Sequence, residues 1–267
     1  MKVVTAISNK NDLGFFKLKM SCALKGLDLV TLTCDQDAFR NHRMKDRILR
    51  SYLSELDDNE IVLFTDGYDA IMLADEDEIL EKFDKIGTDL LFSAETCCYP
   101  DKSLAPRYPA TDSLYKYLNS GGFIGRAGLL KQLHEVDLSE VSGNFTYSNQ
   151  YLWSVIYLEN QHQMKLDTDC EIFCTFSPEI TEQALGEAQR GNREAYVKYF
   201  YEWFNEHFII SNGRIYNKIT GTWPCNAHFN GGASCFLEDY IESWEILYDL
   251  TPGRRSHTVI PVHPATV

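Results

Sequence analysis

Short apolar runs alternate with stretches of helical spacing through the first half of the chain. Four runs have the length and composition of buried strands, and they cover residues 2–7, 27–32, 60–64 and 90–94. Three stretches between them repeat apolar residues at helical intervals, over residues 13–24, 44–56 and 76–83. Strands that alternate with helices indicate a mostly parallel sheet with helices on both faces. Ligands of such sheets bind beyond the carboxyl ends of the strands.

Two of the predicted helices have an apolar side that indicates how they pack. Residues 13–24 offer the core Phe16, Leu18, Met20 and Leu24, and Gly26 is placed to end this helix. Residues 44–56 place Ile48, Leu49, Tyr52 and Leu53 on one side. Each helix is therefore expected to bury that side in the core.

The second half of the chain is less regular. Its spacing predicts a strand over residues 118–124, a helix over 150–158, a strand over 172–176 and a polar helix within 181–207. Asn212-Gly213 predicts the turn of a hairpin. Without a repeat or a linker, we expect one α/β domain over residues 1–250 and a C-terminal tail over residues 251–267.

The composition is that of a globular enzyme, with 44% hydrophobic and 24% charged residues among 267. A formal net charge of -14 excludes polyanion binding by the surface as a whole. One stretch could still form a local basic patch or a solvated helix face, and it holds Arg40, His42, Arg43, Lys45, Arg47 and Arg50.

The cysteines and the lengths of the apolar stretches indicate the cellular compartment of the protein. The eight cysteines include no CxxC pair, and reduced, mostly buried thiols are expected. No window approaches the roughly 18 apolar residues of a membrane-spanning helix, and the N-terminus does not resemble a signal peptide. We therefore expect no membrane association and a cytoplasmic protein of a bacterium or a virus-infected cell. Without a secretory signal, the glycosylation sequon Asn144-Phe145-Thr146 carries little weight.

The main candidate for chemistry follows the predicted strand 60–64. Asp66 and Asp69 stand three positions apart around Gly67, which lets the backbone turn so that both carboxylates face one point. Two carboxylates together with diphosphate oxygens suit an octahedral Mg²⁺ or Mn²⁺. An ordinary Asp-Gly turn is the alternative. Phosphatases of the haloacid dehalogenase type fit poorly, because their two aspartates are two positions apart.

Two glycine-rich segments could complete such a site. Asn119 and Ser120 can hydrogen-bond sugar hydroxyls, and the following Gly121-Gly122 permits close approach of a ligand, although a β-bulge explains paired glycines equally well. His228 can supply an imidazole to a metal, and the glycines after Asn230 can cradle phosphate. A single histidine is more often structural, so this segment counts only together with the others.

Taken together, these segments resemble the glycosyltransferase domain of the procollagen lysyl hydroxylases, which has a GT-A fold, a Rossmann-type mixed sheet with helices on both faces. The matching blocks are residues 62–71, 91–95, 118–125 and 228–231, and they occur in the family's order and at roughly its spacing. The resemblance extends from about residue 2 to about residue 235.

The resemblance implies roles for individual residues. Asp66, Asp69 and His228 correspond to the metal ligands, for Mn²⁺ or Mg²⁺. A UDP-sugar donor would be bound by Thr5, Ile7, Ser8 and Tyr68 at the nucleoside, and by Asn119, Gly121 and Gly122 at the sugar. Lys45 and Arg47 match basic residues of the family, and Lys45 would contact the diphosphate. Asn230 and Gly231 complete the donor-binding candidates. Glu95, Asn149 and Gln150 are the candidate catalytic residues.

Three departures leave the substrates open. Tyr99 replaces a tryptophan before Pro100, Tyr147-Ser148-Asn149 replaces an acidic run before Gln150, and a lysine expected after the histidine-glycine block is absent. We expect a metal-dependent transfer from a UDP-sugar to a hydroxyl, with retention at the anomeric carbon as the family expectation. The acceptor is a hydroxylysine-type protein hydroxyl, a glycan, or the hydroxymethyl group of a modified base in viral DNA. A non-catalytic nucleotide-sugar binder and a UDP-sugar hydrolase are the alternatives.

Overall fold

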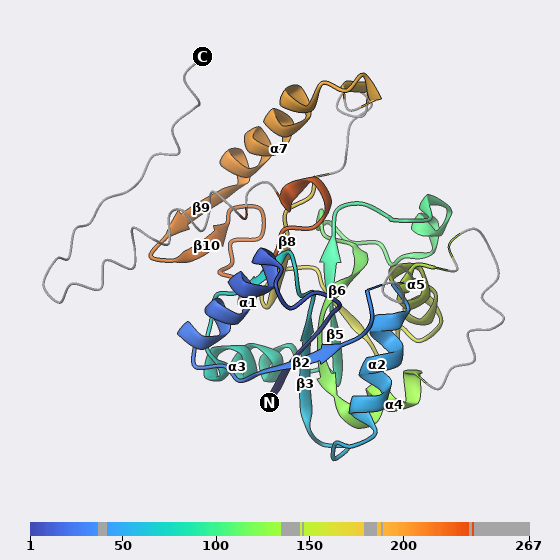
Figure 1. Ribbon diagram of the computed structural model, residues 1–267. Coiled ribbons are helices and arrows are strands. Elements are labelled where there is room, and N and C mark those ends of the chain that lie inside the picture. The colour runs from blue at the N-terminus through green and yellow to red at the C-terminus, as the bar shows by residue number, and fades with distance from the viewer. Residues whose placement is uncertain are drawn as a thin grey trace, which may run out of the picture.

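The structure, a computed structural model, describes residues 1–36, 42–134, 145, 147–178, 186–187, 189–234 and 237 (Figure 1). The strands are β1 (Lys2–Ile7), β2 (Leu29–Thr33), β3 (Ile61–Thr65), β4 (Ala70–Met72), β5 (Leu90–Glu95), β6 (Tyr117–Arg126), β7 (Lys165–Asp167), β8 (Phe173–Thr175), β9 (Phe208–Ser211), β10 (Arg214–Asn217) and β11 (Asn226–His228). The α-helices are α1 (Leu13–Leu24), α2 (Met44–Leu53), α3 (Glu76–Ile86), α4 (Ala127–His134), α5 (Asn149–Glu159) and α7 (Arg193–His207). Two short 3₁₀ helices are η2 (Lys102–Arg107) and η4 (Gly231–Ser234).

The main sheet has six strands in the order β2-β1-β3-β6-β5-β7. β1 pairs in parallel with β2 and β3, and β5 pairs in parallel with β7. β6 runs antiparallel to both of its neighbours, β3 and β5. The sheet is therefore mixed, and the expected parallel arrangement is interrupted by β6, the strand that carries Gly121 and Gly122.

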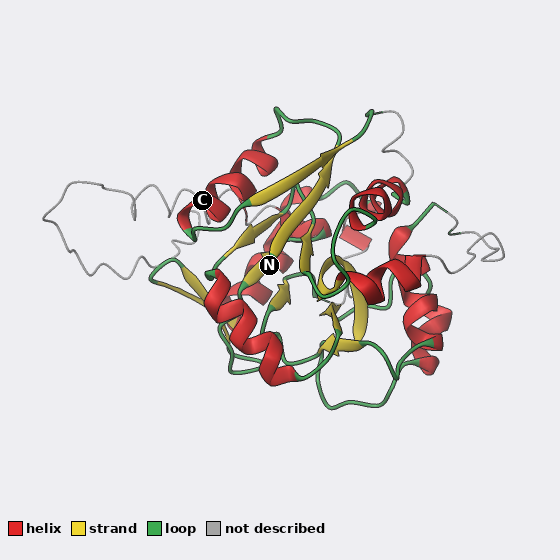
Figure 2. Cartoon of the chain, turned by 90° about the horizontal axis from the view of Figure 1, so that it is seen from below, coloured by secondary structure: helices red, strands yellow, loops and turns green. Residues whose placement is uncertain are grey.

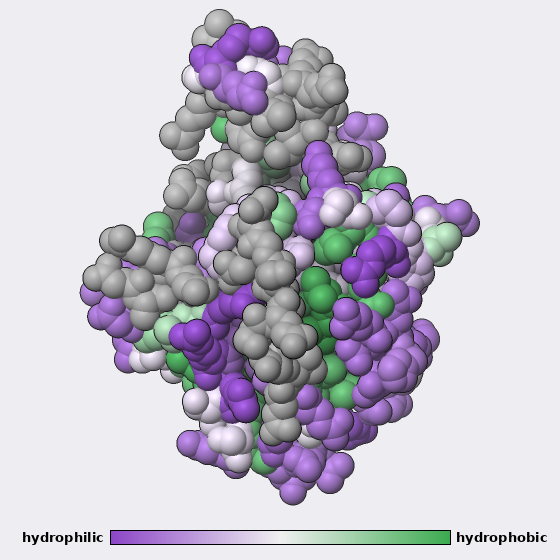
Figure 3. Space-filling model, turned by 90° about the vertical axis from the view of Figure 1, so that its right-hand side faces the viewer, coloured by the Kyte–Doolittle hydropathy of each residue, from purple (hydrophilic) through white to green (hydrophobic). Residues whose placement is uncertain are grey.

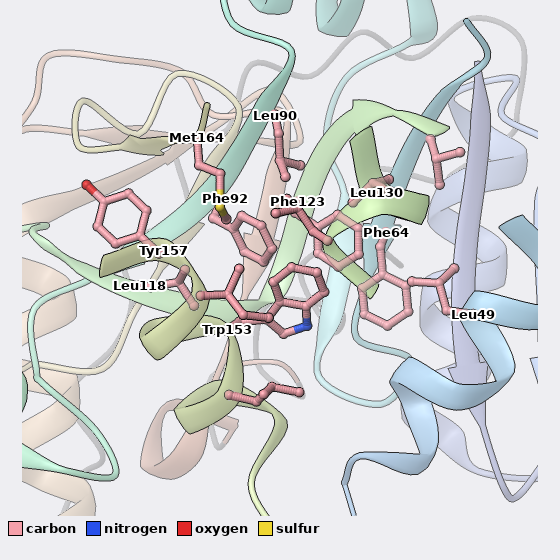
Figure 4. Packing of buried hydrophobic residues seen from close by; sticks show 14 of the residues in the cluster. Leu49, Phe64, Leu90, Phe92, Leu118, Phe123, Leu130, Trp153, Tyr157 and Met164 are labelled. Carbon is pink, nitrogen blue, oxygen red and sulfur yellow. The ribbon is translucent and has the colours of Figure 1, made fainter. Parts of the chain in front are cut away.

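Successive residues of the central strands enter different cores, as the period of two in a strand requires. Val4, Phe64 and Phe123 pack with α2, α4 and α5, whereas Val3 and its counterparts on neighbouring strands pack with α1 and α3. Helices thus cover both faces of the sheet, as Figure 2 shows from below. The first core is rich in aromatic rings, with Phe64 stacked on Phe123 at a centroid distance of 5.0 Å (Figure 4).

A second, three-stranded sheet has the order β4-β11-β8. β11 pairs antiparallel with β4 and parallel with β8, so segments far apart in the sequence meet beside the tip of β3. One face of this sheet packs against α7 and the β9–β10 hairpin through a separate core that includes Phe176, Phe200 and Phe229. The hairpin turns at Asn212-Gly213, as predicted.

The predicted packing of α1 is wrong. Phe16, Met20 and Leu24 are 53%, 37% and 44% exposed, and of the four predicted core residues only Leu18 is buried. α1 instead turns Gly14 and Ser21 toward β4 and the segment before it: a Cβ on Gly14 would lie 1.7 Å from the carbonyl oxygen of Tyr68, and the Ser21 hydroxyl accepts a hydrogen bond from the Met72 amide. Close approach on that side of α1 leaves Phe16, Met20 and Leu24 on the exposed side of the helix.

The other predicted elements form within a few residues of the expected bounds. α2 ends at Leu53 rather than at residue 56, and the helix expected within 181–207 is α7, which begins at Arg193. Residues 181–185, the sequon residues 144 and 146, Arg40, and the tail 251–267 lie outside the described residues, so the domain bounds stay a prediction. Among the described cysteines, Cys22, Cys98, Cys170, Cys174 and Cys225 are buried thiols.

One face of the molecule shows the polar character of the surface (Figure 3). On the face in Figure 3, hydrophilic side chains predominate and hydrophobic ones appear between them. Among the described residues, no helix combines the length and the apolar character that crossing a bilayer requires.

A buried histidine predicts acid sensitivity of the fold. Burial lowers the pKa of His134 to about 4, below the ordinary value of 6.5 for histidine. The unfolded chain therefore binds this proton more readily, and stability falls as pH drops from about 6.5 to about 4, by about 3 kcal/mol at most. Denaturant unfolding of wild type and His134→Phe across this range is expected to show that the variant lacks this part of the loss. Parallel stability curves would contradict the prediction.

Candidate functional site

The turn after β3 carries both aspartates and is pressed against β1. A Cβ on Gly67 would lie 2.4 Å from the Ile7 side chain and 2.9 Å from the Thr5 hydroxyl, so only glycine permits this approach. The Asp66 amide donates a hydrogen bond to the carbonyl of Gly121 on β6 at 2.8 Å. The turn is thereby fixed between β1 and β6, with both carboxylates at the carboxyl end of the parallel strands.

His228 reaches the aspartates through the second sheet. On β11 it pairs with Ala70, which directly follows Asp69, and the next amide, that of Phe229, donates to the carbonyl of Asp69 at 2.7 Å. Its imidazole lies over Gly121, where a Cβ would come within 2.1 Å of the ring. A glycine on β6 therefore makes room for the histidine.

The three side chains converge on one point. His228 Nε2 lies 3.3 Å from an oxygen of Asp69 and 3.7 Å from an oxygen of Asp66, and one ligand atom from each residue lies within 4.8 Å of the others. His228 is 3% exposed, and Nε2 has no aligned hydrogen-bond partner among the described residues. A buried nitrogen without such a partner, facing two carboxylates, fits a divalent cation.

A hydrogen bond behind His228 orients its ring. His228 Nδ1 lies 3.1 Å from Asn119 Oδ1, which also accepts the Gly121 amide at 2.9 Å. Because that oxygen can only accept, Nδ1 must carry the proton, and in the neutral ring Nε2 keeps its lone pair toward the aspartates. Metal-binding histidines commonly have such a partner.

Lys45 supplies the positive charge of the site. Its ammonium group donates to Asp66 Oδ1 at 2.6 Å, while the other oxygen of Asp66 faces His228. Burial alone would lower the pKa of Lys45, but Asp66 outweighs burial and raises it. For Asp66 burial is again opposed, by Lys45 and His228, and its pKa is lowered. Both groups are therefore charged at neutral pH.

Behind the cluster of Asp66, Asp69 and His228 lies a buried amide–carboxylate network centred on Glu95. Asn119 and Asn230 donate to one of its oxygens at 3.1 and 3.0 Å, and Gln150 donates to the other. Asn149 lies next to this network and accepts the Ser120 hydroxyl at 3.4 Å. Burial raises the pKa of Glu95 to about 7 despite these donors, so the carboxyl group can hold or release a proton near neutrality.

A cavity of about 180 Å³ opens beside the cluster and is lined by Ala6, His42, Lys45, Asp66, Gly67, Tyr68 and Asp69. The Tyr68 hydroxyl accepts the amides of Ser8 and Asn9 at 2.7 and 2.8 Å, which fixes its ring at the cavity wall. A larger cavity of about 590 Å³ lies at the opposite end of the main sheet. In the larger cavity, the charge of Arg126 is already paired with Asp89 at 3.0 Å. The smaller cavity beside Asp66 and Asp69 is therefore the better candidate site.

The structure does not bring every predicted residue to the cavity. Thr5 and Ile7 are fully buried behind Gly67 and support the turn from below. Arg47 is exposed, two residues after Lys45 and so about 200° around the helix from it. A Cβ on Gly122 would meet the Phe173 ring rather than the site. Gly231 adopts a φ of 59° at the turn that begins η4.

Sequence reasoning missed two residues of the cavity wall. Ala6 lies between the predicted Thr5 and Ile7, and strand alternation would have indicated that neighbours on β1 face opposite ways. His42 belongs to the basic stretch but was assigned no role. Burial and the nearby Lys45 lower the pKa of His42, so it lines the cavity chiefly as a neutral ring.

Comparison with known proteins identifies a family and several relatives of this chain. A family model described as the PLOD GT domain matches residues 1–244. The chain is 31% identical over 190 residues to an uncharacterized protein of Acanthamoeba polyphaga mimivirus, which covers 69% of this chain and 34% of the relative. It is 30% identical over 194 residues to procollagen-lysine,2-oxoglutarate 5-dioxygenase 1 of Bos taurus, covering 68% of this chain and 26% of the relative.

A solved structure supports the fold alone. A glycosyltransferase involved in the glycosylation of the major capsid of PBCV-1 superposes with a TM-score of 0.50 and 10% identity, covering 90% of this chain and 98% of the other. The chain thus has the sheet and helix arrangement of a GT-A glycosyltransferase, as predicted. It spans only about a quarter to a third of the length of the two sequence relatives above.

Proposed function

The chain belongs to the family of PLOD glycosyltransferase domains, and on that premise we propose that it uses a divalent cation to transfer a sugar from a UDP-sugar to a hydroxyl group. The observation that supports this most is the convergence of Asp66, Asp69 and the buried Nε2 of His228 beside a cavity that Lys45 also lines. Mn²⁺ and Mg²⁺ both suit these ligands.

Asp66, Asp69 and His228 would hold the cation, whose charge neutralises the leaving nucleoside diphosphate. Lys45 would bind the same diphosphate, since its ammonium group lies at 2.6 Å from Asp66 and lines the cavity. The ring of Tyr68, fixed through its hydroxyl, provides a flat surface for the uracil base.

The Glu95 network would receive the sugar. Asn119 and Gln150 reach Glu95 from β6 and α5, so their amide groups are held between the metal-binding cluster and the N-terminus of α5. Fixed amides and a carboxyl group suit sugar hydroxyls, because each group presents donors or acceptors in one orientation. Asn149 stands at the same helix end, where it and Gln150 would face the sugar or the acceptor.

For the acceptor we favour a hydroxylysine-type protein hydroxyl over a modified DNA base. One relative is by name a procollagen-lysine dioxygenase. The basic stretch that favoured DNA does not form a continuous surface in its described part, because Lys45 points into the site and Arg43 is half-buried. A DNA acceptor would also make turnover fall steeply with salt, which distinguishes the two.

A donor and acceptor panel tests the proposal. The protein is incubated with Mn²⁺ or Mg²⁺ and a series of UDP-sugars, and UDP release is measured with hydroxylysine peptides, hydroxymethylated DNA or no acceptor. We expect release that requires a UDP-sugar and a cation, stops on addition of EDTA, and rises with the peptide. Release that ignores the acceptor would indicate a hydrolase, and binding without release would indicate a nucleotide-sugar binder.

Lys45→Met is expected to raise the donor KM about 10- to 100-fold, the loss of one charge-assisted contact with a diphosphate. The measurement is UDP release against donor concentration. Lys131→Met is the matched control, because Lys131 makes a similar 2.6 Å pair with Asp58 at the opposite end of the sheet. An unchanged donor KM in Lys45→Met would exclude Lys45 from donor binding.

A further inference from the structure

A hydrogen bond outside the candidate site joins two of the helices that build it. Asp46, the residue after Lys45 on α2, accepts at Oδ1 the indole N–H of Trp153 on α5, at 2.9 Å. Trp153 is 1% exposed and packs against Phe92 and Phe123, with its nitrogen on the side of the ring that faces α2 (Figure 4). A polar link therefore crosses the aromatic core.

This link costs stability that an apolar pair would not cost. The second oxygen of Asp46 is buried and has no hydrogen-bond partner among the described residues. Burial raises the pKa of Asp46 to about 6, and the Trp153 hydrogen bond is the largest opposing influence. Well-packed apolar residues often replace such buried charges without loss of stability. Packing alone therefore does not explain why Asp46 and Trp153 form this hydrogen bond.

The two helices carry opposite sides of the site. α2 packs mainly against α4 and β1, and α5 packs mainly against β6. The first turn of α2 holds Lys45 and lacks a side-chain cap, since Arg43 at its N-cap makes no capping hydrogen bond. The first turn of α5 holds Gln150, which contacts Glu95. The Asp46–Trp153 bond joins the first turn of α2 to α5 at a residue three positions after Gln150.

We propose that the Asp46–Trp153 hydrogen bond positions Lys45 against Asp66, and thereby sets the affinity of the site for the diphosphate of the donor. Lys45 and Asp46 are neighbours, about 100° apart around the helix. Trp153 on α5 holds Asp46, and Asp66 holds Lys45. These two contacts together fix the rotation of the first turn of α2 about the helix axis. The proposal rests on the proposed function.

Three variants separate positioning from stability. Trp153→Phe removes the N–H and is expected to raise the donor KM about five- to tenfold, the cost of one lost hydrogen bond, with kcat changed less than twofold. Asp46→Asn keeps the accepting oxygen, so its donor KM should stay near that of wild type.

The double variant Asp46→Val with Trp153→Phe removes both polar partners, so thermal stability should recover while the donor KM stays high. Tyr157→Phe, on the same helix but packed against Tyr108, is the control.

Two readouts do not depend on turnover. The Kd for UDP in the presence of Mn²⁺, measured by calorimetry, should rise by the same factor as the KM. A crystal structure of Trp153→Phe should show the 2.6 Å Lys45–Asp66 contact opened. An intact contact would overturn the proposal even if no UDP-sugar proves to be a substrate. A wild-type enzyme that turns over a UDP-sugar while Trp153→Phe loses only thermal stability would overturn it as well.

Discussion

Replacing Asp69 with alanine is expected to lower the rate of UDP release from the donor by about 10³-fold or more, which corresponds to about 4 kcal/mol in the barrier. Asp69 contributes the carboxylate nearest to His228 Nε2, at 3.3 Å, and its loss leaves Asp66 and His228 as two ligands of an incomplete set. The cation would then be bound weakly, and the charge on the leaving diphosphate would be compensated less. Steady-state UDP release with saturating Mn²⁺ measures the effect.

The same variant should retain its fold, because the Asp69 side chain is 31% exposed and its backbone carbonyl, which accepts the Phe229 amide, is unchanged. Calorimetric titration with Mn²⁺ should show the loss of the tight site. Asp89→Ala is the matched control, since it removes a carboxylate paired with Arg126 far from the site. Comparable turnover in Asp69→Ala and wild type at saturating cation would contradict the metal-dependent mechanism.

The framework of the fold was readable from the sequence because it depends on local periodicity. The apolar runs at residues 2–7 and 60–64 became β1 and β3, and Asp66 and Asp69 followed the tip of β3 as the strand pattern required. The hairpin at Asn212-Gly213 was equally local, since a two-residue turn of that type selects its own geometry.

Long-range pairing was not readable in the same way. Nothing near β4 or β11 indicates that they pair, yet this pairing brings His228 to Asp69. The exposure of Phe16 on α1 also depends on a long-range fact, the close approach of Gly14 to Tyr68 and of Ser21 to Met72 on β4. Helical periodicity identified a helix but could not decide which of its sides is buried.

The supporting contacts of the site were the least predictable part. The resemblance to a family named Asn119, Gln150 and Glu95 individually, whereas the structure joins them in one hydrogen-bond network behind His228. The Asp46–Trp153 link lay outside every motif, because its partners are 107 residues apart and neither belongs to a recognisable pattern. Such contacts depend on side-chain distances that only the assembled fold defines.

Gly121→Ala is expected to impair both the fold and the reaction. The added Cβ would lie 2.1 Å from Cε1 of the His228 ring and 2.6 Å from its Nδ1. The backbone cannot easily move away, because β6 is buried and the Gly121 carbonyl accepts the Asp66 amide. The imidazole must therefore move away from Asn119 and the two aspartates. We expect a loss of about 3 kcal/mol in the free energy of unfolding, as overpacked cores show, and a fall in UDP release of at least about 10²-fold.

A double-mutant cycle with His228→Ala identifies the cause of that loss. If Gly121 is required to make room for the imidazole, Gly121→Ala should cost much less stability when His228 is already alanine, while UDP release stays low in the double variant. Gly186→Ala is the control, because the nearest described atoms to its Cβ would be those of the Arg190 side chain, at an ordinary contact distance of 3.6 Å. An equal stability cost in both backgrounds would mean that backbone strain, and not the histidine, demands glycine on β6. In that case the site would depend on His228 and the aspartates alone, without a steric contribution from the strand behind them.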